Sequence, residues 1–204
     1  MNLFENKIDI DNITCHSGGA YGSDSFWEEI GQEFGVKTRA YSYKTKTHKS
    51  PNKIEISDDD YNEGVEQIKM ANLILKRSSI DKFMNLLARN WTQVKYSSQI
   101  FAIGYIVSPG EKGMKGYVSK SNIQTVDGGT GWAISMSINN KKDIYVYDQI
   151  KLKWFNWSYI RNSFIEFNGI PKISVNNFAG IGTREINEDG IRAIYDVYKS
   201  TFTK

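Results

Sequence analysis

Hydrophobic and polar residues follow two different periods along the chain, which predicts a mixture of strands and helices. Short runs rich in β-branched and aromatic residues, several with every second position apolar, are typical of strands. Between them, apolar residues recur every three or four positions, as they do in helices with one buried face. The strands predicted in this way are segments 13–15, 36–43, 100–107, 123–126, 143–150, 153–158 and 173–181.

Helices are expected between and after these strands. The first places Trp27 and Ile30 on a buried face, leaves Glu28 elsewhere, and stops at Gly35. Segments 44–53 and 108–121 are polar and rich in lysine or glycine, and they are expected to be loops, the second a hairpin or lid. The other predicted helices run from a cap at Ser57 or Asp58 to about residue 75, from residue 80 to about 94, from 132 to about 138, and onward from a cap at Asn187.

These elements favour an α/β fold. A strand, a tight glycine turn, a helix and a second strand follow one another in segment 13–43, which is a βαβ unit. Segment 100–107 is the most apolar strand and is expected in the centre of the sheet, while segment 153–158 is expected to pair with 143–150. We therefore predict a single domain over residues 1–204, a Rossmann-like three-layer sandwich with a mainly parallel sheet and an antiparallel edge.

Composition disfavours several classes of protein. The 204 residues, 40% of them hydrophobic, can bury a core without a metal, and the single cysteine, Cys15, excludes an intramolecular disulfide. A net charge of +3 is small for a protein that binds DNA or RNA, so a nucleic-acid partner is disfavoured. Because the chain shows no signal-peptide pattern and no apolar run of about 20 residues, we expect a cytoplasmic protein without a membrane partner.

Three times along the chain, an apolar strand is followed by a glycine turn and then by a helix. These turns are the first turn (residues 17–24), the second turn (127–131) and the third turn (180–184). Backbone N–H groups at such a turn, and at a helix N-terminus behind it, favour an anion such as phosphate. In a parallel sheet these turns share the carboxyl edge, where ligands bind. Any one turn can also use glycine for packing alone.

The side chains beside these glycines suit a phosphorylated ligand. Ser17 and Thr130 can donate to a phosphate or cap a helix, and the two roles are compatible. Arg184 can clamp a phosphate with two hydrogen bonds, or it can form a salt bridge with Glu185 or Glu188. The residues expected to bind the ligand are Ser17, Gly18, Gly19, Tyr21, Asp24, Arg89, Asn90, Gly128, Gly129, Thr130, Gly131, Gly182, Thr183 and Arg184.

Several of these residues leave two roles open. Asp24 can accept a hydrogen bond from a ribose hydroxyl, or it can hold the turn, which is the common role of Asp at a helix start. Arg89 and Asn90 face either the ligand cleft or solvent, and the cleft is favoured. An aromatic ring such as Tyr21 or Trp132 can stack on a base.

Other candidates for chemistry are weaker. His16 and His48 are far apart in sequence and no CxxC or HxxxH spacing occurs, so no metal site or cofactor is expected. Cys15 has no histidine partner and is expected in the core rather than as a nucleophile. Asp148 and Gln149 either form a turn at a strand end or contact a ligand, and the turn is favoured.

The three turns resemble known motifs. Residues 16–24, HSGGAYGSD, resemble the SGGAxGAD-type first turn of the SLOG superfamily, a group of Rossmann-like proteins. It includes YpsA-like proteins, the DNA-processing protein A and the lonely-guy phosphoribohydrolases. Residues 127–131, DGGTG, resemble the superfamily's second glycine motif, PGGxGT, and residues 178–184, FAGIGTR, resemble a first turn of its G[ST]R type. The position of this last motif near the carboxyl end would imply a rearranged element order.

The resemblance implies a nucleotide or nucleotide-derived ligand at these turns. For the hydrolase branch it also implies a catalytic glutamate in the pattern PGGxGTxxE. Here Trp132 stands at the threonine of that pattern and Ser135 at the glutamate, so the catalytic residue is not matched. In an enzyme, Asp127 or Asp24 would have to supply the carboxylate.

We therefore expect a protein that binds a nucleotide-derived signalling molecule, of the cyclic or ADP-ribose type, without turnover. The abundance of Asn, Lys, Ile and Ser is typical of AT-rich genomes such as those of many phages. A phage protein of this kind could sequester a defence signal in the host cytoplasm. The alternative is a nucleotide hydrolase of the lonely-guy type.

Aromatic residues make up 13% of the chain, which is enough for some of them to form a subunit interface. A homo-oligomer is therefore expected.

Overall fold

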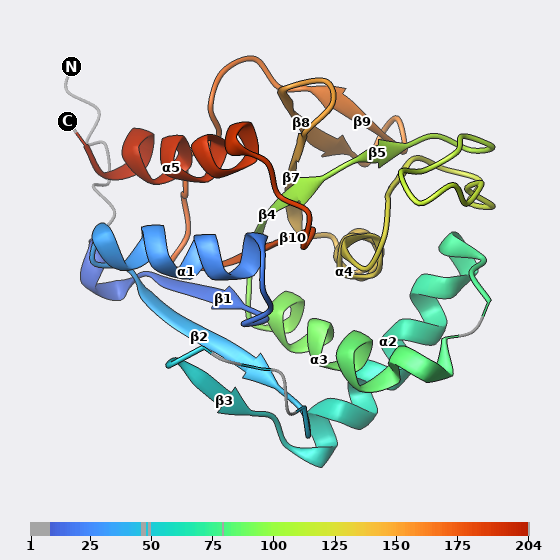
Figure 1. Ribbon diagram of the computed structural model, residues 1–204, viewed down its shortest axis with the longest axis horizontal. Coiled ribbons are helices and arrows are strands. Elements are labelled where there is room, and N and C mark those ends of the chain that lie inside the picture. Colours follow the sequence, from blue (N-terminus) through green and yellow to red (C-terminus); the bar gives the residue numbers. More distant parts are fainter. Residues whose placement is uncertain (1–8, 46–47, 49, 79, 204) are drawn as a thin grey trace.

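The computed structural model describes residues 9–45, 48, 50–78 and 80–203, and it shows an α/β fold in three layers. A mixed sheet lies between helices α1 and α5 on one face and helices α2, α3 and α4 on the other (Figure 1). The helices are α1 (Ser23–Glu33), α2 (Asp58–Leu75), α3 (Met84–Lys95), α4 (Thr130–Asn139) and α5 (Glu188–Phe202), with short 3₁₀ turns at Ile10–Asn12 and Asp81–Phe83.

The main sheet has eight strands, of which six are parallel. Their order is β3-β2-β1-β10-β4-β7-β8-β9, and only β8 and β9 run antiparallel to their neighbours. The predicted mainly parallel sheet with an antiparallel edge is confirmed, and so is the pairing of β7 with β8. The strands are β1 (Thr14–Ser17), β2 (Lys37–Ser42), β3 (Lys53–Glu55), β4 (Gln99–Gly104), β5 (Ile106–Val107), β6 (Thr125–Val126), β7 (Asp143–Asp148), β8 (Lys153–Ser158), β9 (Ser163–Glu166) and β10 (Asn177–Gly182).

The chain order places the switch point of the sheet at β10. From β1 the chain builds β2 and β3 on one side, then crosses to build β4 and β7 on the other. Strand β10 arrives last and fills the position between β1 and β4, with His16 beside Ala179 and Phe178 beside Gln99. The red end of the chain thus lies among the blue and green strands in Figure 1. Ligands of α/β sheets bind at such a point, outside the carboxyl ends of the strands.

Local sequence signals explain where several helices begin and end. The Ser57 side chain accepts from the Asp60 N–H at 3.1 Å, and the Asn187 side chain accepts from the Gly190 N–H at 2.8 Å. Both residues are the predicted caps. Gly35 follows α1 with φ +81°, a conformation that favours glycine.

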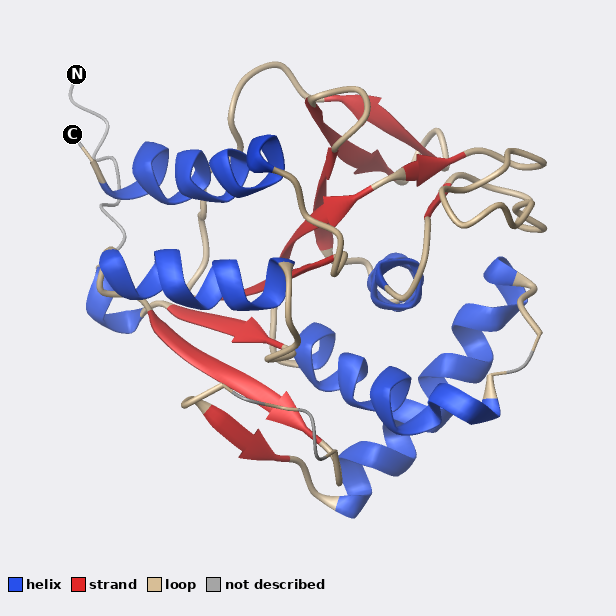
Figure 2. Cartoon of the chain, in the orientation of Figure 1, coloured by secondary structure: helices blue, strands red, loops and turns tan. Residues whose placement is uncertain are grey.

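Two hydrophobic cores fill the space between the layers, which Figure 2 shows as strands enclosed by helices. Successive residues of β4 point to opposite faces of the sheet. Ile100 and Ala102 therefore pack in the core beneath α2, α3 and α4, while Phe101 and Ile103 pack in the core beneath α1 and α5. All six residues of β4 are buried, as expected for a central strand. Cys15 is buried in the second core, as predicted.

Three strands differ from the prediction. The apolar segment 100–107 is divided at Tyr105, whose carbonyl accepts from the Asp127 N–H at 2.9 Å. The Asp148 carboxylate also accepts from the Ile106 N–H at 3.0 Å. These contacts turn the chain away from the main sheet, so that β5 pairs with β6 in a separate two-stranded sheet. Strands β3 and β9 were not predicted. β3 starts at Lys53, the last residue of the predicted loop, and pairs with β2, while the four residues of β9 pair with β8.

Among the residues that the structure describes, no helix combines the length and the apolar character needed to cross a membrane.

Candidate functional site

The first and third turns meet at the carboxyl edge of the sheet. Both the N–H and the hydroxyl of Ser23 donate to the carbonyl of Thr183, at 3.0 and 2.7 Å. A Cβ at Gly22 would lie 2.6 Å from the Cα of Arg184, and Gly22 has φ +99°. A Cβ at Gly182 would lie 2.5 Å from the Ser23 hydroxyl. The glycines therefore allow the two turns to touch, as the shared phosphate site predicted from the sequence requires.

Buried polar side chains hold the first turn from within. The Ser17 hydroxyl donates to Glu28 Oε1 at 2.8 Å and accepts from the Gly19 N–H at 3.1 Å. The Asp24 carboxylate accepts from the Ala20 N–H at 3.4 Å. Ser17 and Asp24 thus both hold the turn, which is one of the two roles that the sequence left open for Asp24. The residue at the N-cap of α1 is Gly22, so Ser17 does not act as the cap that the sequence allowed.

Arg89 approaches this turn from α3. Its side chain is only 6% exposed, and Nη1 lies 3.9 Å from Asp24 Oδ2. Nη1 has no hydrogen-bond partner within the described part of the chain. A Cβ at Gly18 would lie 1.6 Å from Nη1, so the guanidinium fits against the turn only because residue 18 is glycine.

The charges around Arg89 shift its pKa in opposite directions. Burial lowers the pKa of Arg89, the carboxylate of Asp24 raises it, and the positive charge of Arg184 lowers it further. Two arginines from distant parts of the sequence therefore lie near the same turn, and Asp24 partly offsets them. Burial also raises the pKa of Asp24 to about 6, although Arg89 and the Ala20 N–H act in the opposite direction.

Two described residues of the loop after β2, His48 and Ser50, pack near the first turn. A Cβ at Gly19 would lie 2.2 Å from the imidazole of His48, which shows how closely this ring packs on the turn. Burial and then the charge of Arg89 lower the pKa of His48. The hydroxyl of Ser50 donates to the Glu28 carboxylate, which ties the loop to α1. The first turn is thus enclosed by α1, α3 and this loop.

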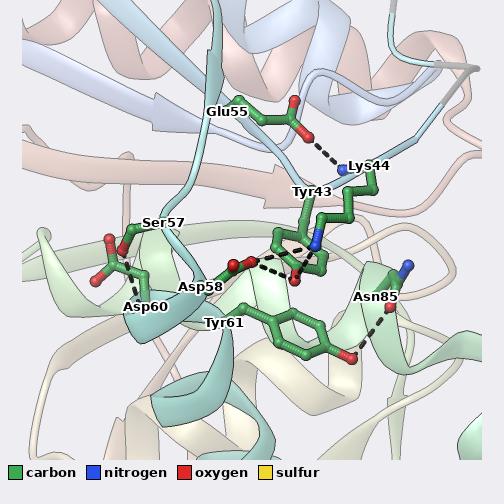
Figure 3. Close-up of polar contacts among 8 residues, drawn as sticks. All are labelled: Tyr43, Lys44, Glu55, Ser57, Asp58, Asp60, Tyr61 and Asn85. Carbon is green, nitrogen blue, oxygen red and sulfur yellow. Dashed lines mark hydrogen bonds and ion pairs between the residues drawn. The ribbon is translucent and has the colours of Figure 1, made fainter.

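A cavity of about 400 Å³ has Arg89 in its wall. Residues 43–45 at the end of β2 and residues 81–86 at the start of α3 line it, together with Arg89. Figure 3 shows part of its wall, in which the Lys44 ammonium donates to the Tyr43 hydroxyl at 2.8 Å and to Asp58 at 3.2 Å. The rings of Tyr43 and Tyr61 stack with centroids 4.0 Å apart. Arg89 therefore belongs to both the turn and the cavity.

The second turn lies at the same edge, next to the end of β4, but its contacts are different. Arg77 Nη1 donates to the Gly128 carbonyl at 2.5 Å, and Nη2 donates to the Val126 carbonyl at 3.1 Å. A Cβ at Gly131 would lie 2.0 Å from the Val126 carbonyl, so this glycine allows α4 to start close to β6. The turn presents carbonyl oxygens to an arginine, a role that the sequence did not predict.

Residues near the second turn are also engaged in structural contacts. The Asp127 carboxylate accepts from the N–H groups of Met114 and Gly128, both at 2.8 Å. Trp132 is 5% exposed and packs in the core, so the prediction that its ring can stack on a base is wrong. Ser135, at the position of the superfamily's catalytic glutamate, is buried inside α4, and Thr130 is buried at its start.

The other sequence candidates divide between exposed and structural positions. Tyr21 is 84% exposed on the first turn, with its ring accessible to a ligand. Asn90 accepts from the amide of Gln93 at 3.4 Å. The carboxylate of Asp148 accepts from three backbone N–H groups, and Gln149 Oε1 accepts from one, so these two residues form the favoured turn.

Sequence reasoning missed Glu28. It was expected away from the buried face of α1, but it is 7% exposed and bonds to Ser17 and Ser50. Its spacing of four residues from Asp24 places both carboxylates on one side of the helix, and that spacing was the available signal. His16 is hydrogen-bonded to Tyr41 and Asn177, and no cluster of potential metal ligands occurs in the described residues.

Comparisons of the chain with protein-family models, with curated proteins and with solved structures find no match. The resemblance to the SLOG superfamily therefore stays a prediction drawn from short motifs, while the fold itself is Rossmann-like.

Proposed function

We propose that this protein binds a phosphorylated, nucleotide-type ligand where the first and third turns meet. The observation that carries the proposal is the buried Nη1 of Arg89, which points at Gly18 without a hydrogen-bond acceptor among the described residues. A buried N–H that lacks an acceptor costs about 1–3 kcal/mol. A phosphate oxygen at this turn would supply the acceptor and the charge that a guanidinium binds best.

Three further features support an anion at this place. The N-terminus of α1, which is the positive end of its dipole, lies at the end of the first turn. Arg184 follows the third turn and lies near enough to Arg89 to lower its pKa. Like charges at one site repel each other, and a bound anion relieves that repulsion. Tyr21 supplies an exposed ring on which a base can stack.

The residues at and after the second turn favour binding without turnover. The expected glutamate is replaced by Ser135, which is buried in α4, and the Asp127 carboxylate already accepts two backbone hydrogen bonds. A protein that holds a nucleotide-derived signal without destroying it could serve in sequestration, the role that the motif resemblance suggests. We include that role in the proposal, together with a cyclic or ADP-ribose-type ligand.

Calorimetric titration tests the proposal with a panel of AMP, cyclic AMP and ADP-ribose. The wild-type protein is expected to bind at least one of them, with the ligand recovered intact. In Arg89→Gln, loss of a charged hydrogen bond should weaken binding about 10- to 100-fold. Arg161→Gln, a loss of the same charge at an exposed position, is the matched control and should bind as the wild type does.

Circular dichroism and thermal unfolding would establish that both variants are folded. The proposal is overturned if no member of the panel binds concentrated wild-type protein. It is also overturned if Arg89→Gln, correctly folded, binds as tightly as the wild type.

A hydrolase is the second candidate, and one observation favours it. Asp24 has a pKa of about 6 and lies beside Arg89, so a carboxylic acid near neutrality is present at the proposed site. Chromatography of each nucleotide after incubation with the protein separates the two functions. Release of a free base by the wild type, lost in Asp24→Asn, would establish hydrolysis; intact nucleotide at equal enzyme and ligand concentrations would exclude it for that nucleotide.

A further inference from the structure

The cavity beside Arg89 carries an inference that rests on the proposed function and narrows its ligand. Arg89 contributes to the wall of the cavity and also contacts the first turn, so a molecule whose phosphate lies on the turn can extend into the cavity. A volume of about 400 Å³ is within the range of small-ligand sites. The side chains that line the cavity away from Arg89 then indicate which chemical groups the rest of the ligand carries.

That part of the cavity wall is rich in hydrogen-bond donors. Lys44 and Lys82 bring ammonium groups from two different elements. Asn85 accepts from the Tyr61 hydroxyl at 3.1 Å through its oxygen, and Figure 3 shows its amide nitrogen pointing away from that bond. This amide donates no hydrogen bond to another described residue, so both of its N–H groups are open to a partner.

Positive charge is also in excess along the lining. Lys44, Lys82 and Arg89 carry three positive charges, and Asp81 carries one negative charge. Asp58 is ion-paired with Lys44 and Asp24 lies 3.9 Å from Arg89, but neither carboxylate lines the cavity. Donors and positive charge together suit an acceptor-rich anion better than the neutral edge of a base.

We propose that the ligand carries two separate anionic groups, one on the first turn at Arg89 and one in the cavity at Lys44 and Lys82. The chemical class is a nucleotide with phosphates at two different positions, such as a nucleoside bisphosphate. The sugar joins the two phosphates and lies between Arg89 and the lysines. A nucleoside monophosphate occupies only the Arg89 end.

Calorimetric titration with two defined compounds tests this proposal. Adenosine 3′,5′-bisphosphate should bind wild-type protein at least about tenfold tighter than adenosine 5′-monophosphate, since it gains a second set of charged hydrogen bonds. The double variant Lys44→Gln/Lys82→Gln should bind both compounds with the affinity of the monophosphate. Lys69→Gln, which removes one exposed lysine charge on α2, is the control and should keep the wild-type preference.

Each outcome supports or overturns one of the two proposals. Equal binding of the two compounds by wild-type protein, with loss of both in Arg89→Gln, overturns the second anionic group and leaves the proposed function standing. The second anionic group is also overturned if the lysine double variant binds both compounds more weakly by the same factor. A general attraction between charges would then explain the effect of the two lysines. Binding that persists in Arg89→Gln overturns both proposals, whereas no binding of either compound by the wild type overturns the second anionic group.

Discussion

Arg89 shows how one residue can link two parts of a binding site that are distant in sequence. It belongs to α3, it contacts Gly18 in the first turn, and it forms part of the cavity wall. Its guanidinium is buried, and the carboxylate of Asp24 lies 3.9 Å away as a counter-charge. This ion pair is too long to satisfy the hydrogen-bonding capacity of a guanidinium, which makes both residues sensitive to what binds beside them.

The raised pKa of Asp24 predicts a particular pH dependence of stability. Because the pKa rises from its ordinary value of 3.8 to about 6 on folding, the folded state binds more protons between these values. The contribution of Asp24 to stability is therefore full below about pH 4 and is lost as the pH rises through 6. A shift of this size corresponds to about 3 kcal/mol.

Urea unfolding of wild-type protein and Asp24→Asn from pH 4 to pH 7 measures this effect. The free energy of unfolding of the wild type, relative to the variant, should fall by up to about 3 kcal/mol over that range. Asp59→Asn, at an exposed position on α2, should show no comparable change. Parallel curves for wild type and Asp24→Asn would contradict the assignment.

Single residues were predictable from the sequence where their role is local. Ser17, Gly18 and Asp24 lie in one glycine turn, and a short motif is enough to single them out. Glu28 and His48 reach the same turn only through folding, one along α1 and one through the loop after β2. Their contacts depend on tertiary structure, which a pattern of neighbouring residues does not contain.

At the scale of elements, the second turn and α4 are fixed by close backbone contact. Gly131 lies so near the Val126 carbonyl that a Cβ would be 2.0 Å from it. At Gly129, two residues earlier, an added Cβ would meet open space, and the backbone angles are already helical, φ −63° and ψ −32°. A close backbone contact therefore requires glycine at position 131, whereas the space and the backbone angles at position 129 would accept a residue with a Cβ.

Alanine substitutions at Gly131 and Gly129 should therefore have different effects on the stability of the protein. Gly131→Ala should destabilise the protein by about 1–3 kcal/mol, because a backbone carbonyl cannot move aside easily. Gly129→Ala should be neutral or stabilising by up to about 1 kcal/mol, since alanine restricts the unfolded chain. Thermal and urea unfolding of both variants measure the difference, and equal destabilisation would show that the close contact at Gly131 is not limiting.

Elements with strong local signals were predicted well, and short elements were not. The helix caps Ser57 and Asn187 act through bonds to residues three positions later, so the sequence contains all that is needed. Strands β5 and β9 have two and four residues and exist because a partner strand is present. The division of segment 100–107 at Tyr105 likewise depends on Asp127 and Asp148, which come much later in the chain.

At the scale of the whole molecule, the sheet consists of two groups of strands that are joined by β10. Strands β3, β2 and β1 lie on one side of it, and strands β4, β7, β8 and β9 lie on the other. The sequence predicted the α/β class and the antiparallel edge, because alternating elements imply them. It did not predict the place of β10, since strand order follows from long-range pairing.

Hydrogen exchange should reflect this arrangement. Amides of β10 and β4 are bonded within the centre of the sheet and lie between two cores, so they should exchange slowest. Amides of the edge strands β3 and β9 should exchange much faster. Exchange of native protein followed by NMR tests the order, and rates in β10 as fast as those in β3 would contradict a single cooperative sheet.

The late arrival of β10 has a consequence for biosynthesis. A ribosome must translate past residue 182 before β1 and β4 can acquire their common neighbour, so the sheet is completed only after all of its other strands have been made. Arg184 emerges within the same stretch. The nascent chain therefore gains the middle of its sheet and the second arginine of the proposed site together, and incomplete translation products would lack both.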